Sequence, residues 1–259
     1  MTAVAHGNPR ALPMTYTTDT QPAGGAELEL FADLVPLRAI SPTTTEETSY
    51  LASAFQLELE IGLADRLELG LYATFVPSLG DQLAGTAQFA GAGNGLKQRL
   101  RYTLNPEPDS VPILGNAAAY VEIAENEREI ELEAKLLIER RLDRVRIAAN
   151  LSAEYELYFS GQREWVLNPS AGATYEVTPR YHVGLDGFLR AEYPQHPAPD
   201  ARTFGLGPHV YVGPAVLLAF DKGWWSLGAY GRLTSPGHDL DPGEPYGRVW
   251  IRSAIGFDL

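Results

Sequence analysis

Apolar and polar residues alternate along most of this chain, and the alternation is clearest in its final stretch. Within residues 247–259, Val249 and Ile251 fall on one face and Arg248 and Arg252 on the other. A period of two residues places alternate side chains on opposite faces of a β-strand. A terminal strand that is apolar at every second position is typical of the closing strand of an outer-membrane β-barrel, whose apolar face meets lipid. A soluble sandwich or a lipocalin-like barrel would show a similar strand with its apolar face turned inward.

The same alternation recurs through the rest of the chain and divides it into twelve expected strands. The clearest lies at 127–140, where five apolar residues at every second position alternate with glutamates and a lysine. A helix would scatter these apolar residues around its axis, so the pattern favours a strand. The expected strands are about 26–36, 50–62, 66–77, 94–104, 114–124, 127–140, 144–158, 164–177, 181–193, 203–220, 223–233 and 247–259.

The connections between these strands differ in length in a regular way. Those after the even strands are mostly short, as at 63–65, whereas several of those after the odd strands are long, as at 78–93. Short turns on one rim and long loops on the other are typical of outer-membrane barrels. Aromatic residues near both strand ends resemble the bands found at membrane interfaces. They are Tyr102, Tyr175, Tyr181, Phe220, Trp225 and Phe257 near the short turns, and Phe75, Tyr155, Trp165, Tyr193 and Phe204 near the long loops.

We therefore predict an all-β chain that forms a single antiparallel transmembrane β-barrel of about twelve strands over residues 25–259. We expect short periplasmic turns, longer extracellular loops and a location in the bacterial outer membrane. The strand at 164–177 contains Pro169, and that at 203–220 contains Pro208 and Pro214, which cannot donate to a ladder. The strand at 203–220 is therefore expected to form either one long strand or two shorter ones.

Composition excludes several other classes of protein. The chain has 20 basic and 33 acidic residues, a net charge of −13, which argues against a nucleic-acid partner. It has no cysteine, so it carries no disulfide, thiolate metal site or cysteine nucleophile. Its longest apolar stretch, near Val216–Phe220, is far shorter than the roughly 20 residues of a transmembrane helix.

Residues 1–24 show no periodicity and are rich in threonine, proline, alanine and glycine. We expect either a flexible periplasmic segment or a small plug. They lack the basic start and apolar core of a signal peptide, so Met1 is expected to begin a trimmed mature form.

The face opposite the expected lipid surface carries many charges, which would need partners or water inside a barrel. Hairpin geometry places Glu60 opposite Glu68, and the following strand brings Arg101 near Glu68. Closure of the barrel would place Arg248 and Arg252 beside Glu29 and Asp33. We therefore expect an acidic wall on the first three strands between basic rows on the fourth and the last. This charge network comprises Glu29, Asp33, Glu58, Glu60, Glu68, Lys97, Arg99, Arg101, Arg248 and Arg252. It would select solutes by their charge or hold a narrow barrel rigid.

Aromatic residues also fall on the face expected to line the lumen. They could form an apolar patch for an aromatic solute or pack the interior. They are Tyr72, Tyr120, Phe188, Tyr211, Tyr230 and Trp250, together with Phe31 and Trp224.

Candidates for catalysis are few, and we predict no enzyme, cofactor or metal. His209 is expected opposite Glu192, but no serine is placed to complete a hydrolase triad. The loop Asp239–Glu244 has three carboxylates that could hold Ca²⁺, although a solvated acidic loop is the better interpretation.

Three segments resemble known families. Residues 15–24, Thr-Tyr-Thr-Thr-Asp-Thr-Gln-Pro-Ala-Gly, followed by Glu27-Leu28-Glu29, resemble the start of a group of uncharacterised outer-membrane barrels. Two further segments are similar to outer-membrane transporters of the phenol-degradation meta-pathway (MetA-like) type. They are residues 58–72, which end in Gly-Leu-Ala-Asp-Arg-Leu-Glu-Leu-Gly-Leu-Tyr, and residues 94–102. The resemblance implies a barrel of roughly twelve strands that takes up small, often aromatic or hydrophobic, compounds. It carries over no catalytic residues.

The expected function is passage of a small solute across the outer membrane. The alternative is a narrow, plugged barrel with a structural or surface-interaction role. Expected partners are membrane lipid, the solute and, through the terminal strand, the barrel-assembly machinery.

Overall fold

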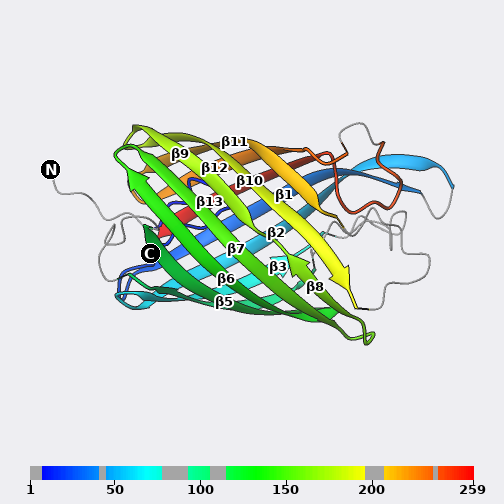
Figure 1. Ribbon diagram of the computed structural model, residues 1–259, viewed down its shortest axis with the longest axis horizontal. Helices are drawn as coiled ribbons and strands as arrows, with labels where there is room; N and C mark the ends of the chain where they lie inside the picture. The colour runs from blue at the N-terminus through cyan, green and yellow to red at the C-terminus, as the bar shows by residue number, and fades with distance from the viewer. Residues whose placement is uncertain (1–7, 41–44, 78–92, 106–114, 196–206, 236–238) are drawn as a thin grey trace.

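The structure is a computed structural model that describes residues 8–40, 45–77, 93–105, 115–195, 207–235 and 239–259. Its strands form one antiparallel sheet that closes on itself as a barrel (Figure 1). No helix in the described ranges is long and apolar enough to span a membrane. The strands are β1 (Ala26–Ile40), β2 (Glu47–Ala64), β3 (Leu67–Phe75), β4 (Gly95–Thr103), β5 (Asn116–Asn126), β6 (Glu129–Leu142), β7 (Val145–Tyr158), β8 (Arg163–Leu167), β9 (Ser170–Thr178), β10 (Tyr181–Pro194), β11 (His209–Phe220), β12 (Gly223–Arg232) and β13 (Val249–Asp258).

The barrel has twelve strand positions because β8 and β9 share one of them. Both pair with β7 on one side and with β10 on the other. They are separated at Asn168 and Pro169, where proline has no N–H to give to the ladder. Pairing of β1 with β13, from Glu27 opposite Asp258 to Leu34 opposite Ile251, closes the barrel. The predicted all-β, twelve-stranded antiparallel fold is confirmed.

Several strand limits differ from those predicted. β1 and β2 pair as far as Ile40 opposite Glu47, so this hairpin is longer than expected. β11 begins at His209, and residues 203–206 of the expected strand, like Phe204 itself, lie outside the described residues. Pro214 lies within β11, where the ladder to β12 is interrupted between Val212 and Ala215.

The two rims of the barrel differ as predicted. Two-residue turns at 65–66, 143–144, 179–180 and 221–222 lie on one rim, called here the turn rim. The first and last strands also meet there, since the Leu259 N–H donates to the Ala26 carbonyl at 3.0 Å. The opposite rim, called the loop rim, carries the connections 41–46, 76–94, 195–208 and 233–248 together with the short ones at 127–128 and 159–162. Among the connections between the described strands, 104–115 is the one long exception at the turn rim.

Apolar side chains face outward and charged ones inward, the reverse of a soluble protein. Leu151 on β7 is 58% exposed, whereas Glu154 on the same strand is 7% exposed. Outward aromatic residues lie at both ends of the barrel, with Tyr102, Tyr175, Tyr181 and Phe257 near the turn rim and Phe75, Trp165 and Tyr193 near the loop rim. A continuous apolar exterior over a polar interior is the arrangement that lipid requires.

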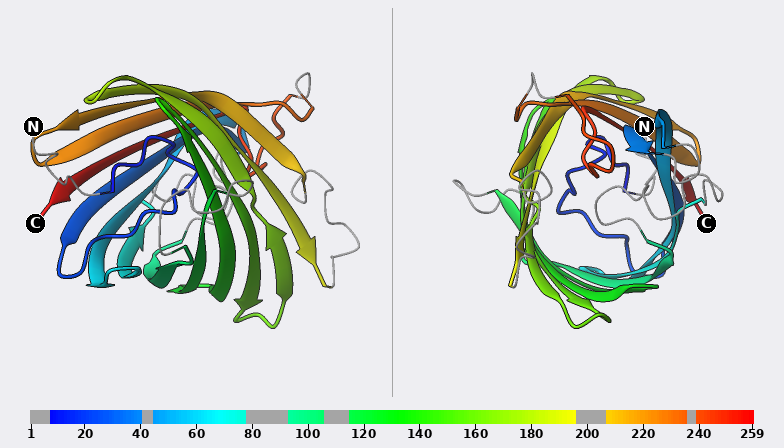
Figure 2. Two further views of the ribbon diagram at one scale, coloured as in Figure 1. Left: turned by 60° about the vertical axis from the view of Figure 1, so that its left-hand side comes forward. Right: turned by 90° about the vertical axis from the view of Figure 1, so that its right-hand side faces the viewer.

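The N-terminal segment, residues 8–25, lies inside the barrel (Figure 2). It enters beside β1, reaches the middle of the lumen at Met14–Tyr16 and returns to the turn rim, where the Gly24 N–H donates to Gly62 at 2.8 Å. Its polar contacts reach β1, β2, β3, β4, β6, β7, β9 and β10. The segment therefore crosses the lumen in the half of the barrel nearer the turn rim.

Candidate functional site: the barrel lumen

The half of the lumen near the turn rim holds a group of buried glutamates from three neighbouring strands. Strand alternation carries every second residue inward, so each strand contributes one or two carboxylates at the same level. We call this group the first acidic cluster; its members are Glu27 and Glu29 on β1, Glu58 and Glu60 on β2, and Glu68 on β3, all 0% exposed. Such burial of charge is costly unless cations and hydrogen bonds compensate it.

Arg10 of the N-terminal segment supplies part of that compensation. One of its guanidinium nitrogens lies 2.8 Å from both Glu29 and Glu58 and 2.7 Å from Glu60. Burial would lower the pKa of Arg10, but Glu29 and the other acids around it raise that pKa well above its ordinary value. Arg10 therefore carries its charge and connects the segment to two strands.

Arg99 and Arg101 of β4 complete the compensation. Arg99 lies 2.5 Å from Glu68, and Arg101 lies 2.7 Å from the other oxygen of the same carboxylate. The structure thus places Arg101 beside Glu68, directly across from it in the β3–β4 pairing.

The predicted pairing of Glu60 with Glu68 is wrong. Glu60 lies opposite Gly70, and Glu68 lies opposite Gly62. The turn lies at 65–66 and not at 63–65, and a register shift of one residue between Gly62 and Ala64 also alters the pairing. A bulge of this kind cannot be read from turn length alone. Gly70 leaves room for Arg99, because a Cβ there would lie 2.8 Å from the Arg99 Nε.

Further along β1 towards the loop rim, Asp33 pairs with Arg252 of β13 through two bonds of 2.8 and 2.7 Å. The Trp250 indole donates to the same carboxylate at 2.7 Å. Arg248 does not join this network as expected; it precedes β13 and pairs with Asp239 at 2.7 Å in the loop-rim connection.

Lys97 also has partners other than those expected. Its Nζ lies 3.5 Å from both Glu122 of β5 and Glu131 of β6. It belongs to the loop-rim half of the lumen, and these two partners lie outside the first acidic cluster. The basic row on β4 is thus divided between two groups of acids.

The lumenal aromatic residues form separate groups instead of one patch. Phe188, Tyr211, Tyr230 and Trp250 pack together, with the Phe188 and Tyr211 rings stacked at 4.8 Å and Trp250 edge-on to Phe188 at 5.4 Å. Phe31 and Trp224 pack with Ala11 of the N-terminal segment.

A third aromatic group surrounds Arg99 of β4. The guanidinium carbon of Arg99 lies 5.5 Å from the centre of the Tyr72 ring and 5.6 Å from that of Tyr120. Tyr16 packs against Tyr120 at 5.5 Å between ring centres. These tyrosines therefore face cations as well as one another.

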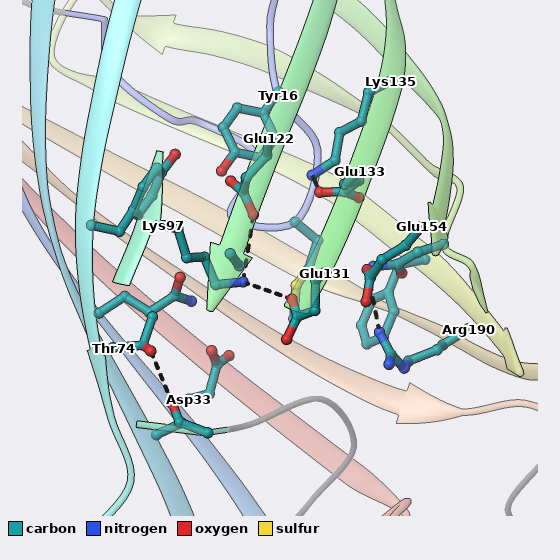
Figure 3. A pocket seen from close by; sticks show the side chains of 18 of the residues that line it. Tyr16, Asp33, Thr74, Lys97, Glu122, Glu131, Glu133, Lys135, Glu154 and Arg190 are labelled. Atoms are coloured by element: carbon teal, nitrogen blue, oxygen red, sulfur yellow. Dashed lines mark hydrogen bonds and ion pairs between the residues drawn. The ribbon is translucent and has the colours of Figure 1, made fainter. Parts of the chain in front are cut away.

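A cavity of about 190 Å³ lies in the lumen between Tyr16 and residues near the loop rim, such as Thr74 and Asn126 (Figure 3). Its lining mixes charged and aromatic side chains. The charged ones include Asp33, Lys97, Glu122, Glu131, Glu133, Lys135, Glu154, Arg190 and Arg252, and the aromatic ones include Tyr16, Tyr72, Tyr120, Phe188 and Trp250.

The structure does not place His209 opposite Glu192, as the hydrolase candidate required. His209 lies opposite Arg190, not Glu192, in the β10–β11 pairing. Its ring stacks on Tyr246 at 3.9 Å, and it is the Tyr246 hydroxyl that donates to Glu192. The pairing of His209 with Glu192 was therefore wrong.

Arginine side chains already bind two carboxylates of the acidic loop Asp239–Glu244. Glu244 lies 2.5 Å from Arg232 and is buried with it, and Asp239 binds Arg248. Two of its three carboxylates thus already have cations. The described residues do contain one set of carboxylates close enough to share an ion, namely Glu27, Glu29 and Glu60.

Sequence reasoning missed two residues that organise the lumen, Arg10 and Arg190. Arg10 lies in a segment without periodicity, but it is the one lysine or arginine among residues 1–24, whereas the lumen has an excess of acids. Arg190 lies within 3.2 Å of Glu156 and Glu192. Arg190 falls on the polar face of the expected strand at 181–193, as does Glu192, but its other partner, Glu156, comes from β7.

The fold has solved counterparts. The COG4313 outer membrane channel from Pseudomonas putida F1 superposes with a TM-score of 0.59 over 93% of this chain and 98% of that one, at 13% identity. The NanC porin superposes with a TM-score of 0.56 over 90% and 100%, at 11% identity. The chain has the fold of outer-membrane channels. No protein-family model and no curated protein matches the sequence, so the MetA-like resemblance stays a prediction.

Proposed function

We propose that this protein is an outer-membrane channel that passes a small solute through its lumen. The observation that carries the proposal is the cavity near the loop rim, which has charged and aromatic groups on its walls and lies above the N-terminal segment. Sites that recognise small molecules are typically concave, with aromatic surface and a few convergent polar groups. A solute entering from the loop rim would meet this cavity before the segment.

The chemistry of the lining favours a solute with an apolar or aromatic part. Phe188 and Trp250 present one aromatic surface to the cavity, and Tyr72 and Tyr120 present another. The charged residues between them would hold a polar group of the same solute. This extends the aromatic-solute hypothesis by adding a polar group to the solute.

Passage requires the N-terminal segment to move, because it crosses the lumen. Around its tip the segment is held by hydrogen bonds, such as Thr15 to Asp186 at 2.7 Å and the Tyr16 N–H to Asn150 at 2.7 Å. Polar contacts can be exchanged for water at modest net cost, whereas extensive apolar packing cannot. We infer that the segment is a plug that shifts when the channel conducts.

The second candidate function is a closed, structural barrel. It is favoured by the number of strands to which the segment is bonded and by the ion pairs of the first acidic cluster. The two functions differ in whether the folded protein carries current.

Single-channel recording in planar bilayers tests the proposal. We expect stable current steps from the unaltered chain. A Thr15→Cys and Asp186→Cys pair, in a protein that has no other cysteine, would tether the segment to β10. Under oxidising conditions the tethered protein should lose most of its current and recover it on reduction.

The two single-cysteine variants are the controls and should be insensitive to the redox state. Full current in the oxidised double variant would exclude movement of the segment as a condition for passage. Protein that is folded and inserted but silent under all conditions would favour the closed barrel.

A further inference from the structure

A second group of carboxylates lines the lumen on the wall made by β6, β7, β8 and β10. We call it the second acidic cluster; its members are Glu129, Glu131, Glu133, Glu154, Glu156, Glu164 and Glu192. Glu131 lies opposite Glu156, Glu133 opposite Glu154, and Glu156 opposite Glu164. Like charges in directly opposed positions destabilise a strand pair, so this wall needs compensating positive charge.

The cations of the protein compensate this cluster less closely than the first one. Lys135 lies 2.9 Å from Glu133, and Arg190 lies 3.1 Å from Glu156. The remaining contacts are longer, with Arg190 3.9 Å from Glu154 and Lys97 3.5 Å from Glu131. In the first acidic cluster, by contrast, three arginines lie within 2.8 Å of their carboxylates.

Of the three carboxylate oxygens of the second cluster that lack a hydrogen-bond partner, one belongs to a residue that lines the cavity. It is Oε1 of Glu133, whose side chain is 8% exposed. Glu131, Glu133 and Glu154 all line the cavity, and Figure 3 shows their carboxylates at its wall. A buried acceptor without a donor is costly, and a donor entering the cavity would relieve that cost.

The neighbouring rings suit a positive charge. Tyr16 and Tyr120 both face the Lys135 ammonium, at 4.9 and 4.4 Å from their ring centres. An ammonium group within about 6 Å of an aromatic face is attracted by the ring electrons. Carboxylates and aromatic faces thus share the cavity.

We propose that the cavity binds a small organic ammonium ion, with its charged nitrogen at Glu133 and Glu154 and its apolar or aromatic body against the tyrosines. An organic ammonium ion would then be the solute class of the proposed channel. Binding of the ion does not depend on the channel function, whereas its passage does. An inorganic divalent cation fits less well, because Lys97, Lys135 and Arg190 stand among the carboxylates. Ca²⁺, for example, takes six or more oxygen ligands, and aromatic rings supply none.

The test is calorimetric titration of the folded full chain in detergent with benzylammonium, and with benzyl alcohol and benzoate as the neutral and anionic counterparts. We expect benzylammonium to bind at least ten times more tightly than either. Glu133→Gln combined with Glu154→Gln should weaken benzylammonium at least tenfold and leave benzyl alcohol unchanged. Asp65→Asn, which removes an exposed carboxylate at the turn rim, should change none of the three.

Equal affinity for the three probes, or an unaltered benzylammonium affinity in the double variant, would overturn the proposal. So would tight binding of CaCl₂ that the same variant abolishes while benzylammonium fails to bind. The outcome is separable from that of the channel proposal. A protein that binds benzylammonium but carries no current contradicts the channel alone, whereas a conducting protein without this preference contradicts the ligand class alone.

Discussion

At the scale of single residues, Arg10 shows how one cation can decide the position of a whole segment. It lies within 2.8 Å of three buried carboxylates on β1 and β2. Removing one partner of a buried ion pair costs about 3 kcal/mol or more, since the other charge stays buried. We expect Arg10→Ala to raise the population with a released segment roughly 100-fold, which follows from about 3 kcal/mol. Chymotrypsin cleavage after Tyr16 measures that population.

Two further variants make this result specific to the ion pairs. Glu29→Gln added to Arg10→Ala should recover part of the protection, because the uncompensated charge on β1 is then removed. Arg180→Ala disrupts a pair with Asp221 that is exposed at the turn rim, and exposed pairs contribute little. Cleavage at the wild-type rate in Arg10→Ala would mean that hydrogen bonds alone hold the segment.

The pairs that sequence could predict are those set by neighbouring strands. Glu68 with Arg101 and Asp33 with Arg252 follow from alternation and from the order of the strands. The error at Glu60 came from the turn, which lies at 65–66 instead of 63–65, and that at Arg248 from its position before β13. Partners from distant parts of the chain, such as Arg10, have no spacing that would reveal them.

At the scale of elements, the contact between the N-terminal segment and β2 depends on a glycine. The Gly62 N–H donates to the Gly25 carbonyl at 2.9 Å, and a Cβ on Gly62 would lie 2.0 Å from the carbonyl oxygen of Pro22. We expect Gly62→Ala to displace the returning arm of the segment and to lower the free energy of unfolding by about 1–3 kcal/mol, as for other overpacked sites. Urea unfolding in detergent measures the change.

Gly231 on β12 provides the matched control. A Cβ there would meet nothing within 4 Å, so Gly231→Ala should change the unfolding free energy by less than about 0.5 kcal/mol. If the two alanine variants are equally stable, the segment can move aside without loss, and its contact with β2 is not a tight fit.

Proline positions explain why strand limits were less predictable than strand identity. Alternation marks a strand over its whole length, but it does not say where a ladder pauses. Pro169 divides β8 from β9, whereas Pro214 stays within β11 and interrupts pairing on one side only. The outcome depends on whether the missing N–H points to a partner strand, which sequence alone does not specify.

At the scale of the whole molecule, the fold was predictable and the contents of the lumen were not. The two-residue period and the alternating connection lengths both require a closed sheet with an apolar exterior. Neither reports where residues 8–25 lie, because that segment has no period and its contacts are spread over many strands. The cavity depends on that placement, since Tyr16 forms part of its lining.

Barrel closure itself can be tested at Ala254, in the middle of β13. Ala254 is fully buried and pairs with Phe31 of β1 and with Ser226 of β12. Proline there removes an N–H and disturbs the ladder in a central strand, at a cost of about 3 kcal/mol or more. We expect the refolded wild-type chain to migrate differently on a denaturing gel with and without boiling, and Ala254→Pro to lose this difference.

Leu259→Pro is the control for this experiment, because it removes only the hydrogen bond from Leu259 to Ala26 beyond the end of β13. It should retain the shift on boiling after refolding in detergent, which makes the result independent of cellular assembly. Persistence of the shift in Ala254→Pro would mean that the barrel tolerates an open seam beside β13. A wild-type chain without any shift would contradict the closed barrel, because the closing β1–β13 pairing leaves the sheet no free edge.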